Sequence, residues 1–209
     1  HLLPPNAGQR YFGGSSSGEG IDYHGMLLAW YDHWLKGQCN GVDSDPRVYY
    51  FLMGQNIWQE SDEWPPHCNS IPFYLQSDGK ANVSCNNGSL SPDSPKENEP
   101  YDSFLHNPFN PVPTIGGPYI RGIPGIIEVG ATEQGVVERR DDVLVYTSQA
   151  LETDIEVIGQ ISLVLWAVTT APDTDWVAKL TIVETDGSSY NVCEGILRSS
   201  FRSSLEDPS

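Results

Sequence analysis

The chain has 209 residues, of which 11 are Lys or Arg and 28 are Asp or Glu, so its formal net charge is −17. This charge would repel phosphate backbones and anionic membrane surfaces, which argues against nucleic acid and membrane as partners. No apolar run approaches the roughly 18 residues that a membrane-spanning helix needs, and the chain does not open like a signal peptide. The acidic balance fits cytosol and secretion equally, so the compartment stays open.

The start of the chain is His1 rather than Met. We therefore expect a fragment of a longer chain or a processed product. Its length suits one large domain, or one medium domain with an attached fragment.

The first motif along the chain is Gly14-Ser15-Ser16-Ser17-Gly18, which fits the G-x-S-x-G pattern of the α/β-hydrolase nucleophile elbow. An elbow needs a buried strand before the serine and a helix directly after it. Residues 1–12 contain two prolines and no β-branched run, and two further glycines follow before helical periodicity begins. We predict a flexible loop here and do not expect Ser16 to be a nucleophile.

Residues 21–36 are predicted to form an amphipathic helix. Asp22 is a candidate N-cap and Gly37 a natural C-terminal stop. Its apolar face consists of Leu27, Trp30, Tyr31, Trp34 and Leu35. A face this broad and aromatic needs a partner surface, such as a sheet.

From Arg47 onward the sequence has the character of an all-β domain. Strand-like apolar runs separated by Gly, Pro, Asn and Asp occupy 47–53, 71–76, 142–147, 155–168, 176–184 and 189–198. Without helical patterns between them, a two-sheet sandwich or jelly roll is favoured over a parallel sheet. We expect 77–100 to be a surface excursion with at most a short strand near Leu90, and 106–117 to be an extended proline-rich connector. The last predicted strand has no closing hairpin, so we expect the domain to continue past Ser209.

The polar residues have structural interpretations when taken singly. Asp173-Thr174-Asp175 is predicted to be a turn whose carboxylates accept backbone N–H bonds. No metal site is expected, because the histidines and cysteines lack ligand spacing and His24 and His33 lie on different helix faces. The other histidines are His67 and His106, and the cysteines, expected to be buried free thiols, are Cys39, Cys68, Cys85 and Cys193. Asn82 and Asn87 each begin a glycosylation acceptor pattern in a polar loop.

Several longer stretches, in this order, carry a resemblance to a known family: LLAWYDHWLKG, PRVYYFLMGQNIWQESDEWPP, FYLQSDG, NPFNPVPTIGG, RRDDVLVYTS and DTDWVAKLTIVETDGSSYNVCEGILR. Together they resemble the C-terminal half of the cocaine esterase and X-prolyl dipeptidyl-peptidase family of serine hydrolases. The resemblance covers nearly the whole chain. It implies an α/β-hydrolase domain joined to a C-terminal, galactose-binding-like jelly roll. Residues 1–44, with the helix at 21–36, would then be the remnant of the hydrolase domain, and 45–209 the jelly-roll β-sandwich.

The resemblance also implies the chemistry, which is hydrolysis of esters or X-Pro peptide bonds by a Ser-Asp-His triad without a cofactor. In the family the serine and aspartate precede the region resembled here. The histidine comes just before the loop that leads into the DHWLKG helix, and His1 occupies that position. We therefore expect His1 to be the triad base, the fragment to be inactive alone, and the N-terminal hydrolase part and a small ester or peptide to be its partners.

An alternative interpretation is a free-standing jelly-roll module that binds carbohydrate through exposed tryptophans. The aromatic helix favours the hydrolase, because a binding module has no use for such a helix before its first strand. The four tryptophans outside the helix, Trp58, Trp64, Trp166 and Trp176, are expected to be core or packing residues.

Overall fold

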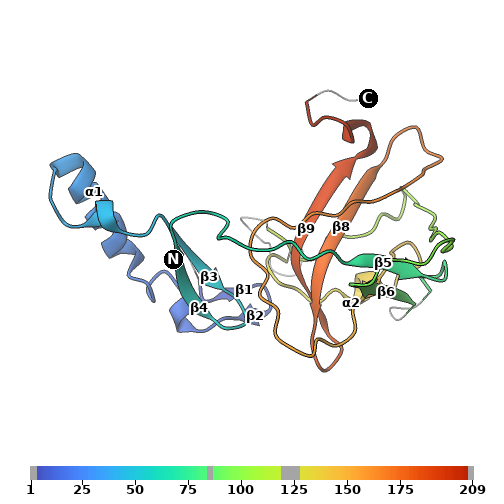
Figure 1. The fold of residues 1–209 in the computed structure, drawn as a ribbon, viewed down its shortest axis with the longest axis horizontal. Helices are drawn as coiled ribbons and strands as arrows, with labels where there is room; N and C mark the ends of the chain where they lie inside the picture. The colour runs from blue at the N-terminus through green and yellow to red at the C-terminus, as the bar shows by residue number, and fades with distance from the viewer. Residues whose placement is uncertain (1–3, 84–86, 119–127, 207–209) are drawn as a thin grey trace. The chain divides into compact units, whose positions relative to one another are not determined.

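The computed structural model describes residues 4–83, 87–118 and 128–206, and over these ranges the chain is mainly β (Figure 1). The strands are β1 (Asn6–Ala7), β2 (Arg10–Tyr11), β3 (Val48–Leu52), β4 (Ile57–Ser61), β5 (Tyr74–Ser77), β6 (Gly88–Ser91), β7 (Tyr146–Thr147), β8 (Asp175–Val183) and β9 (Ser189–Arg198). The α-helices are α1 (Tyr23–Lys36) and α2 (Gly135–Glu138), and the 3₁₀ helices are η1 (Gly14–Ser16), η2 (Val42–Ser44) and η3 (Ser199–Phe201). The chain divides into two compact units: one runs to Cys68 and includes Val157–Gln160, and the other comprises Asn69–Glu156 and the chain from Ile161 onward.

Helix α1 has the predicted cap and stop, although it begins at Tyr23, two residues later than predicted. Asp22 caps its N-terminus by accepting a hydrogen bond from Gly25 N at 3.2 Å. Gly37 ends it in the left-handed conformation, with φ of 68°, which a glycine adopts without steric cost. None of its residues is buried, and Leu35 is 76% exposed. The expected packing of its aromatic face on a partner surface is therefore not seen in the described residues.

The first unit is built on the β3–β4 hairpin. The two strands are antiparallel, with Phe51 opposite Trp58 and their rings in edge contact at 5.4 Å. Phe12 packs against Phe51 from the N-terminal segment, and Leu52 is buried. The strand at 47–53 was predicted, whereas β4 was missed because its sequence, IWQES, has few apolar residues.

The second unit contains a three-stranded sheet in the order β5-β6-β7 and the long antiparallel hairpin of β8 and β9, which lie side by side in Figure 1. The β8–β9 hairpin matches the predicted strands at 176–184 and 189–198. A bulge interrupts it, because Leu180 pairs with Cys193 and Thr181 with Asn191, which leaves Val192 without a cross-strand partner. The short strand expected near Leu90 is β6.

Three strand predictions were wrong in whole or in part. Residues 155–168 form neither helix nor strand, only Tyr146–Thr147 of 142–147 are in a strand, and the strand predicted at 71–76 begins at Tyr74. A strand forms when a neighbour satisfies its backbone groups, and no described segment pairs with 155–168. Its apolar side chains are left in solvent, with Val164 81% and Trp166 96% exposed.

The described core is small for the length of chain. The buried hydrophobic residues there are Leu52, Ala81 and Val137. The mainly β class is confirmed. The described strands form separate small sheets, so the jelly-roll arrangement stays a prediction.

Candidate functional site

Ser16 does not form a nucleophile elbow. It ends η1, and its Oγ donates towards the carbonyl oxygens of Gly13 at 2.7 Å and Pro5 at 3.3 Å. Trp58 Nε1 donates to Ser15 O at 2.7 Å, which ties this turn to β4. Within the described part of the chain the Ser16 hydroxyl is hydrogen-bonded to backbone carbonyls and not to a basic side chain that could activate it. The predicted loop contains a short 3₁₀ helix.

The predicted catalytic residue, His1, lies outside the described residues. Of the other histidines, His33 Nδ1 is 2.9 Å from Gln38 O at the C-terminal end of α1, and the ring of His24 lies 6.1 Å from that of Tyr23. Within 4–83, 87–118 and 128–206, no group of three His, Cys, Asp or Glu residues could hold a metal ion. In the same ranges no helix is both long and apolar enough to cross a membrane.

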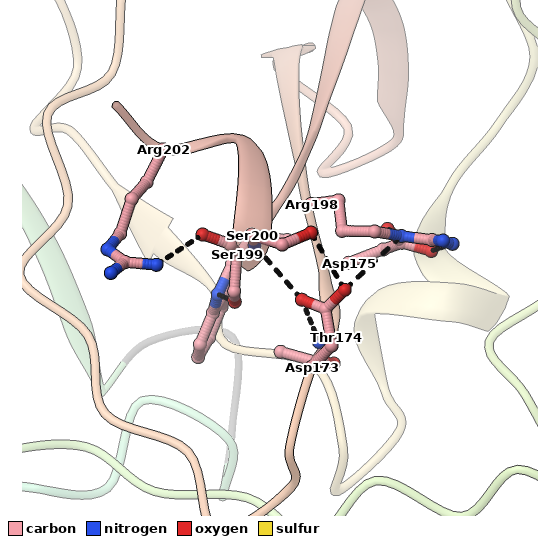
Figure 2. Close-up of polar contacts among 8 residues, drawn as sticks. Asp173, Thr174, Asp175, Arg198, Ser199, Ser200 and Arg202 are labelled. Atoms are coloured by element: carbon pink, nitrogen blue, oxygen red, sulfur yellow. Dashed lines mark hydrogen bonds and ion pairs between the residues drawn. The ribbon is translucent and has the colours of Figure 1, made fainter. Parts of the chain in front are cut away.

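Asp173 forms the predicted turn and also closes the open end of the β8–β9 hairpin (Figure 2). Its Oδ1 accepts hydrogen bonds from Thr174 N and Ser200 N, both at 3.0 Å, and its Oδ2 accepts one from Ser200 Oγ at 2.9 Å. Ser199 N donates to Thr174 O at 2.8 Å, so η3 is held against the turn before β8. The prediction is confirmed for Asp173, whereas Asp175 lies in β8 and its carboxylate accepts hydrogen bonds from Arg198 instead of backbone N–H groups.

Arg198 adds an ion pair to the same end of the hairpin. Its Nε and Nη2 donate to the two carboxylate oxygens of Asp175 at 2.8 and 3.0 Å, and Figure 2 shows the two side chains meeting across the strands. These bonds lower the pKa of Asp175 and raise that of Arg198. The hydrogen bond from Ser200 similarly lowers the pKa of Asp173. Both carboxylates therefore stay ionised to a lower pH than a free aspartate would, and each joins two segments of the chain.

A buried polar network joins β9 to the segment before α2, and sequence reasoning missed it. Asn191 Oδ1 accepts a hydrogen bond from Thr132 N at 2.8 Å, and its Nδ2 donates to Gly130 O at 3.1 Å. Gln134, which is 1% exposed, donates through Nε2 to Ile115 O at 2.9 Å, and its Oε1 accepts from Lys179 Nζ at 3.2 Å. An Asn in the middle of a predicted strand was the available signal, because an amide there needs polar partners once it is buried.

A second cluster was also missed, around Asp102. Its carboxylate accepts hydrogen bonds from Ser77 Oγ and Tyr146 OH, each at 2.6 Å, and from Ala81 N at 2.9 Å. Burial tends to raise the pKa of Asp102, but these three bonds outweigh it and the pKa is lowered. Burial, followed by the bond to Asp102, raises the pKa of Tyr146, so its phenol stays protonated and is a poor nucleophile.

The cysteines and the glycosylation candidates have mixed outcomes. Cys39, Cys68 and Cys193 are free, as predicted, but the expectation of burial was wrong, because all three are exposed. Cys85 lies outside the described residues. Asn82 Nδ2 donates to Ser103 O at 3.1 Å and Asp141 O at 2.7 Å, so the nitrogen that would carry a glycan is engaged in the fold.

The prediction that the four tryptophans outside α1 are packing residues also has mixed outcomes. Trp58 packs on Phe51, and Trp176 makes edge contact with Phe104 and donates to Ser199 Oγ at 2.8 Å, so both are packing residues as predicted. Trp64 is 58% exposed although its ring lies 5.5 Å from that of Tyr50, and Trp166 is almost fully exposed. The packing prediction was therefore wrong for Trp166, which lies in the unpaired segment 155–168.

Taken together, these contacts define a mainly β protein whose described polar clusters hold chain segments together. Residues 40–209 match the family described as the X-Pro dipeptidyl-peptidase C-terminal non-catalytic domain, and the chain belongs to this family.

Curated relatives agree with that family. The chain is 36% identical over 186 residues to a protein named cocaine esterase from Rhodococcus sp. strain MB1 Bresler, a match that covers 88% of this chain and 31% of the relative. It is 28% identical over 190 residues to proteins provisionally named serine esterases from Mycobacterium bovis and Mycobacterium tuberculosis, covering 90% of this chain and 28% of each relative. The chain thus spans about a third of the length of the curated relatives it matches.

Proposed function

We propose that this chain is the C-terminal part of a serine hydrolase that cleaves esters or X-Pro peptide bonds through an acyl-enzyme. The observation that carries the proposal is the family match over residues 40–209, together with relatives named as esterases. Since those relatives are about three times as long as the matched region, the hydrolytic machinery would lie in the part of the protein that precedes this domain.

The chain alone is proposed to be inactive. In the described ranges the one serine that fits a nucleophile motif, Ser16, donates to backbone carbonyls. The polar clusters around Asp102, Asp173 and Asn191 are engaged with backbone groups of the fold. Acyl-enzyme chemistry needs a nucleophile within hydrogen-bond reach of a base that is oriented by a third group. The name of the family, a non-catalytic domain, supports the same proposal.

His1 is the residue of this chain that we propose takes part in the reaction. It would accept the proton of a serine outside the chain as that serine attacks the substrate carbonyl, and would return the proton to the leaving group. An acid outside the chain would orient its ring. Residues 1–44 would complete the hydrolase domain, and the jelly roll of 45–209 would pack against it.

The exposed apolar surfaces support a role within a larger protein. The aromatic face of α1 and the segment 155–168 both leave large side chains in solvent, and exposed apolar surface of this extent marks interaction sites. The carbohydrate-binding alternative is not favoured, because the matching family and relatives are those of peptidases and esterases.

The test is a substitution in the full-length protein that contains this chain. His1→Ala is expected to lower kcat for hydrolysis of a p-nitrophenyl acyl ester by about a thousandfold or more, as loss of a triad base does. His24→Ala is the matched control, since His24 lies on α1 and is expected to leave kcat unchanged. If His1→Ala retained the wild-type rate, the proposed role of His1 would be wrong.

A further inference from the structure

The proline-rich segment at residues 107–113, Asn-Pro-Phe-Asn-Pro-Val-Pro, holds a defined turn. Two hydrogen bonds accepted by Asn107 close this turn. Its side-chain Oδ1 accepts from Phe109 N, and its backbone oxygen accepts from Asn110 N, each at 3.0 Å. The prolines restrict the backbone on both sides of this turn. We refer to residues 107–113 as the proline loop.

An arginine from a distant part of the sequence holds the proline loop in place. Arg140 Nη2 donates to Asn110 O at 2.8 Å. The same guanidinium is fixed by two hydrogen bonds to Asp142, from Nε to Oδ1 and from Nη2 to Oδ2, each at 2.6 Å. Asp142 is only 9% exposed, so this anchor is set in the body of the second unit. The proline loop is therefore held both by the hydrogen bonds of its own turn and by Arg140.

The residue that this arrangement presents to solvent is an aromatic one. Phe109 is 96% exposed, although it lies at the centre of the turn. An exposed phenyl ring gains no hydrophobic stabilisation in the described structure. A rigid, exposed aromatic side chain does suit binding, because aromatic anchors dominate interface energies and a fixed loop loses little conformational entropy on association.

We propose that Phe109 is a docking anchor that inserts into an apolar pocket on the hydrolase part of the same protein. This inference rests on the proposed function. The length of the relative supports the hydrolase part as the partner of Phe109. The chain spans 31% of the cocaine esterase it matches, so most of such a protein is available to cover exposed groups on this domain. The loop meets that surface in a fixed conformation, and Arg140 acts as a positioning residue for it.

The experiment uses the full-length protein with Phe109 replaced by the photo-crosslinker p-benzoylphenylalanine. We expect irradiation to join position 109 to a peptide that precedes this chain, identified by mass spectrometry. The matched control places the same crosslinker at Leu105, which is 85% exposed but lies outside the turn, and should give no such product. In addition, Phe109→Ala should speed amide hydrogen exchange of the crosslinked peptide by about tenfold or more, and Leu105→Ala should leave it unchanged.

Three results would overturn the proposal: no crosslink from position 109, crosslinks confined to this chain, or crosslinks to a second molecule. Ester hydrolysis by the same sample separates this inference from the proposed function. An active enzyme without the crosslink contradicts only the docking anchor. A crosslink to the preceding part in a protein that hydrolyses neither esters nor X-Pro peptides contradicts only the proposed function.

Discussion

Arg198 in β9 holds Asp175 in β8 through two hydrogen bonds of 2.8 and 3.0 Å, at the open end of the longest hairpin in the described structure. The pairing lies beside the Asp173 turn, which binds Ser200 just after β9 (Figure 2). The β8–β9 hairpin and η3, which follows β9, are thus held together by charged groups at the surface. Geometry of this bidentate kind is the case in which a surface ion pair is expected to matter.

The first prediction concerns this hairpin end. Arg198→Ala should lower the melting temperature, and by more than Arg202→Ala, because Arg198 makes two hydrogen bonds to a carboxylate, whereas the bond from Arg202 to Ser199 O is to a neutral backbone group. The pKa values of Asp173 and Asp175 are lowered in the folded state, so their stabilisation is present above about pH 4 and is lost as the pH falls through the folded values. Thermal unfolding from pH 7 to pH 2 checks both points, and an equal acid sensitivity in Arg198→Ala and wild type would refute the second.

The second prediction concerns the buried network. Asn191→Ala should reduce the free energy of unfolding by about 2 kcal/mol, because it leaves the buried Thr132 N without its partner, whereas Gly130 O keeps its bond from Gly117 N. Val192→Ala is the adjacent control. Val192 is the 44% exposed bulge residue, and its truncation should cost less than about 1 kcal/mol. Urea denaturation measures both values, and similar losses in the two variants would show that the network contributes little.

The third prediction concerns alkaline pH. The folded pKa of Tyr146 is raised by burial and by its bond to Asp102, so its stabilisation is complete below the unfolded value of about 10 and is lost as the pH rises above it. Tyr146→Phe removes the ionisable hydroxyl. Although the variant should be less stable at pH 7, its free energy of unfolding should fall less between pH 9 and 12 than that of the wild type, as followed by urea denaturation. Parallel pH profiles would contradict this assignment.

The fourth prediction concerns the glycine- and serine-rich turn. Trp58→Phe keeps an aromatic ring opposite Phe51 but removes the donor to Ser15 O, which should cost about 1 kcal/mol. In the wild type, Ser16 N and Ser17 N donate the hydrogen bonds that form η1, and in the variant these amides should exchange faster with solvent. Trp64→Phe serves as the control, since Trp64 is more than half exposed. Hydrogen exchange measured by NMR separates the two variants.

The sequence predicted those parts of the fold that depend on local signals. The cap at Asp22, the stop at Gly37 and the alternating runs of β8 and β9 all express local backbone preferences, and their elements formed as expected. The segment 155–168 was predicted wrongly because its apolar run describes a strand only when another strand is present to pair with it. The predictions that the cysteines and Trp166 would be buried were wrong for the same reason, because burial depends on which other segments cover a residue.

The polar clusters show a different limit. The Asp173 turn was predictable, because its first acceptor contact, to Thr174 N, is with the next residue in the chain. The contacts of Asn191 and Asp102 reach residues 59 to 61 and 21 to 44 positions away. Sequence periodicity carries no information on such long-range pairings. The family, by contrast, was recognisable from long stretches of sequence, and residues 40–209 confirm it.

The central claim is that this chain is the C-terminal part of a serine hydrolase and is inactive by itself, and it is tested most directly by an assay of the chain alone. Purified residues 1–209 and their Ser16→Ala variant are incubated with a p-nitrophenyl acyl ester, and release of p-nitrophenolate is followed against a buffer blank. The account predicts no turnover above the blank for either protein. Turnover by the wild-type chain that Ser16→Ala abolishes would contradict it.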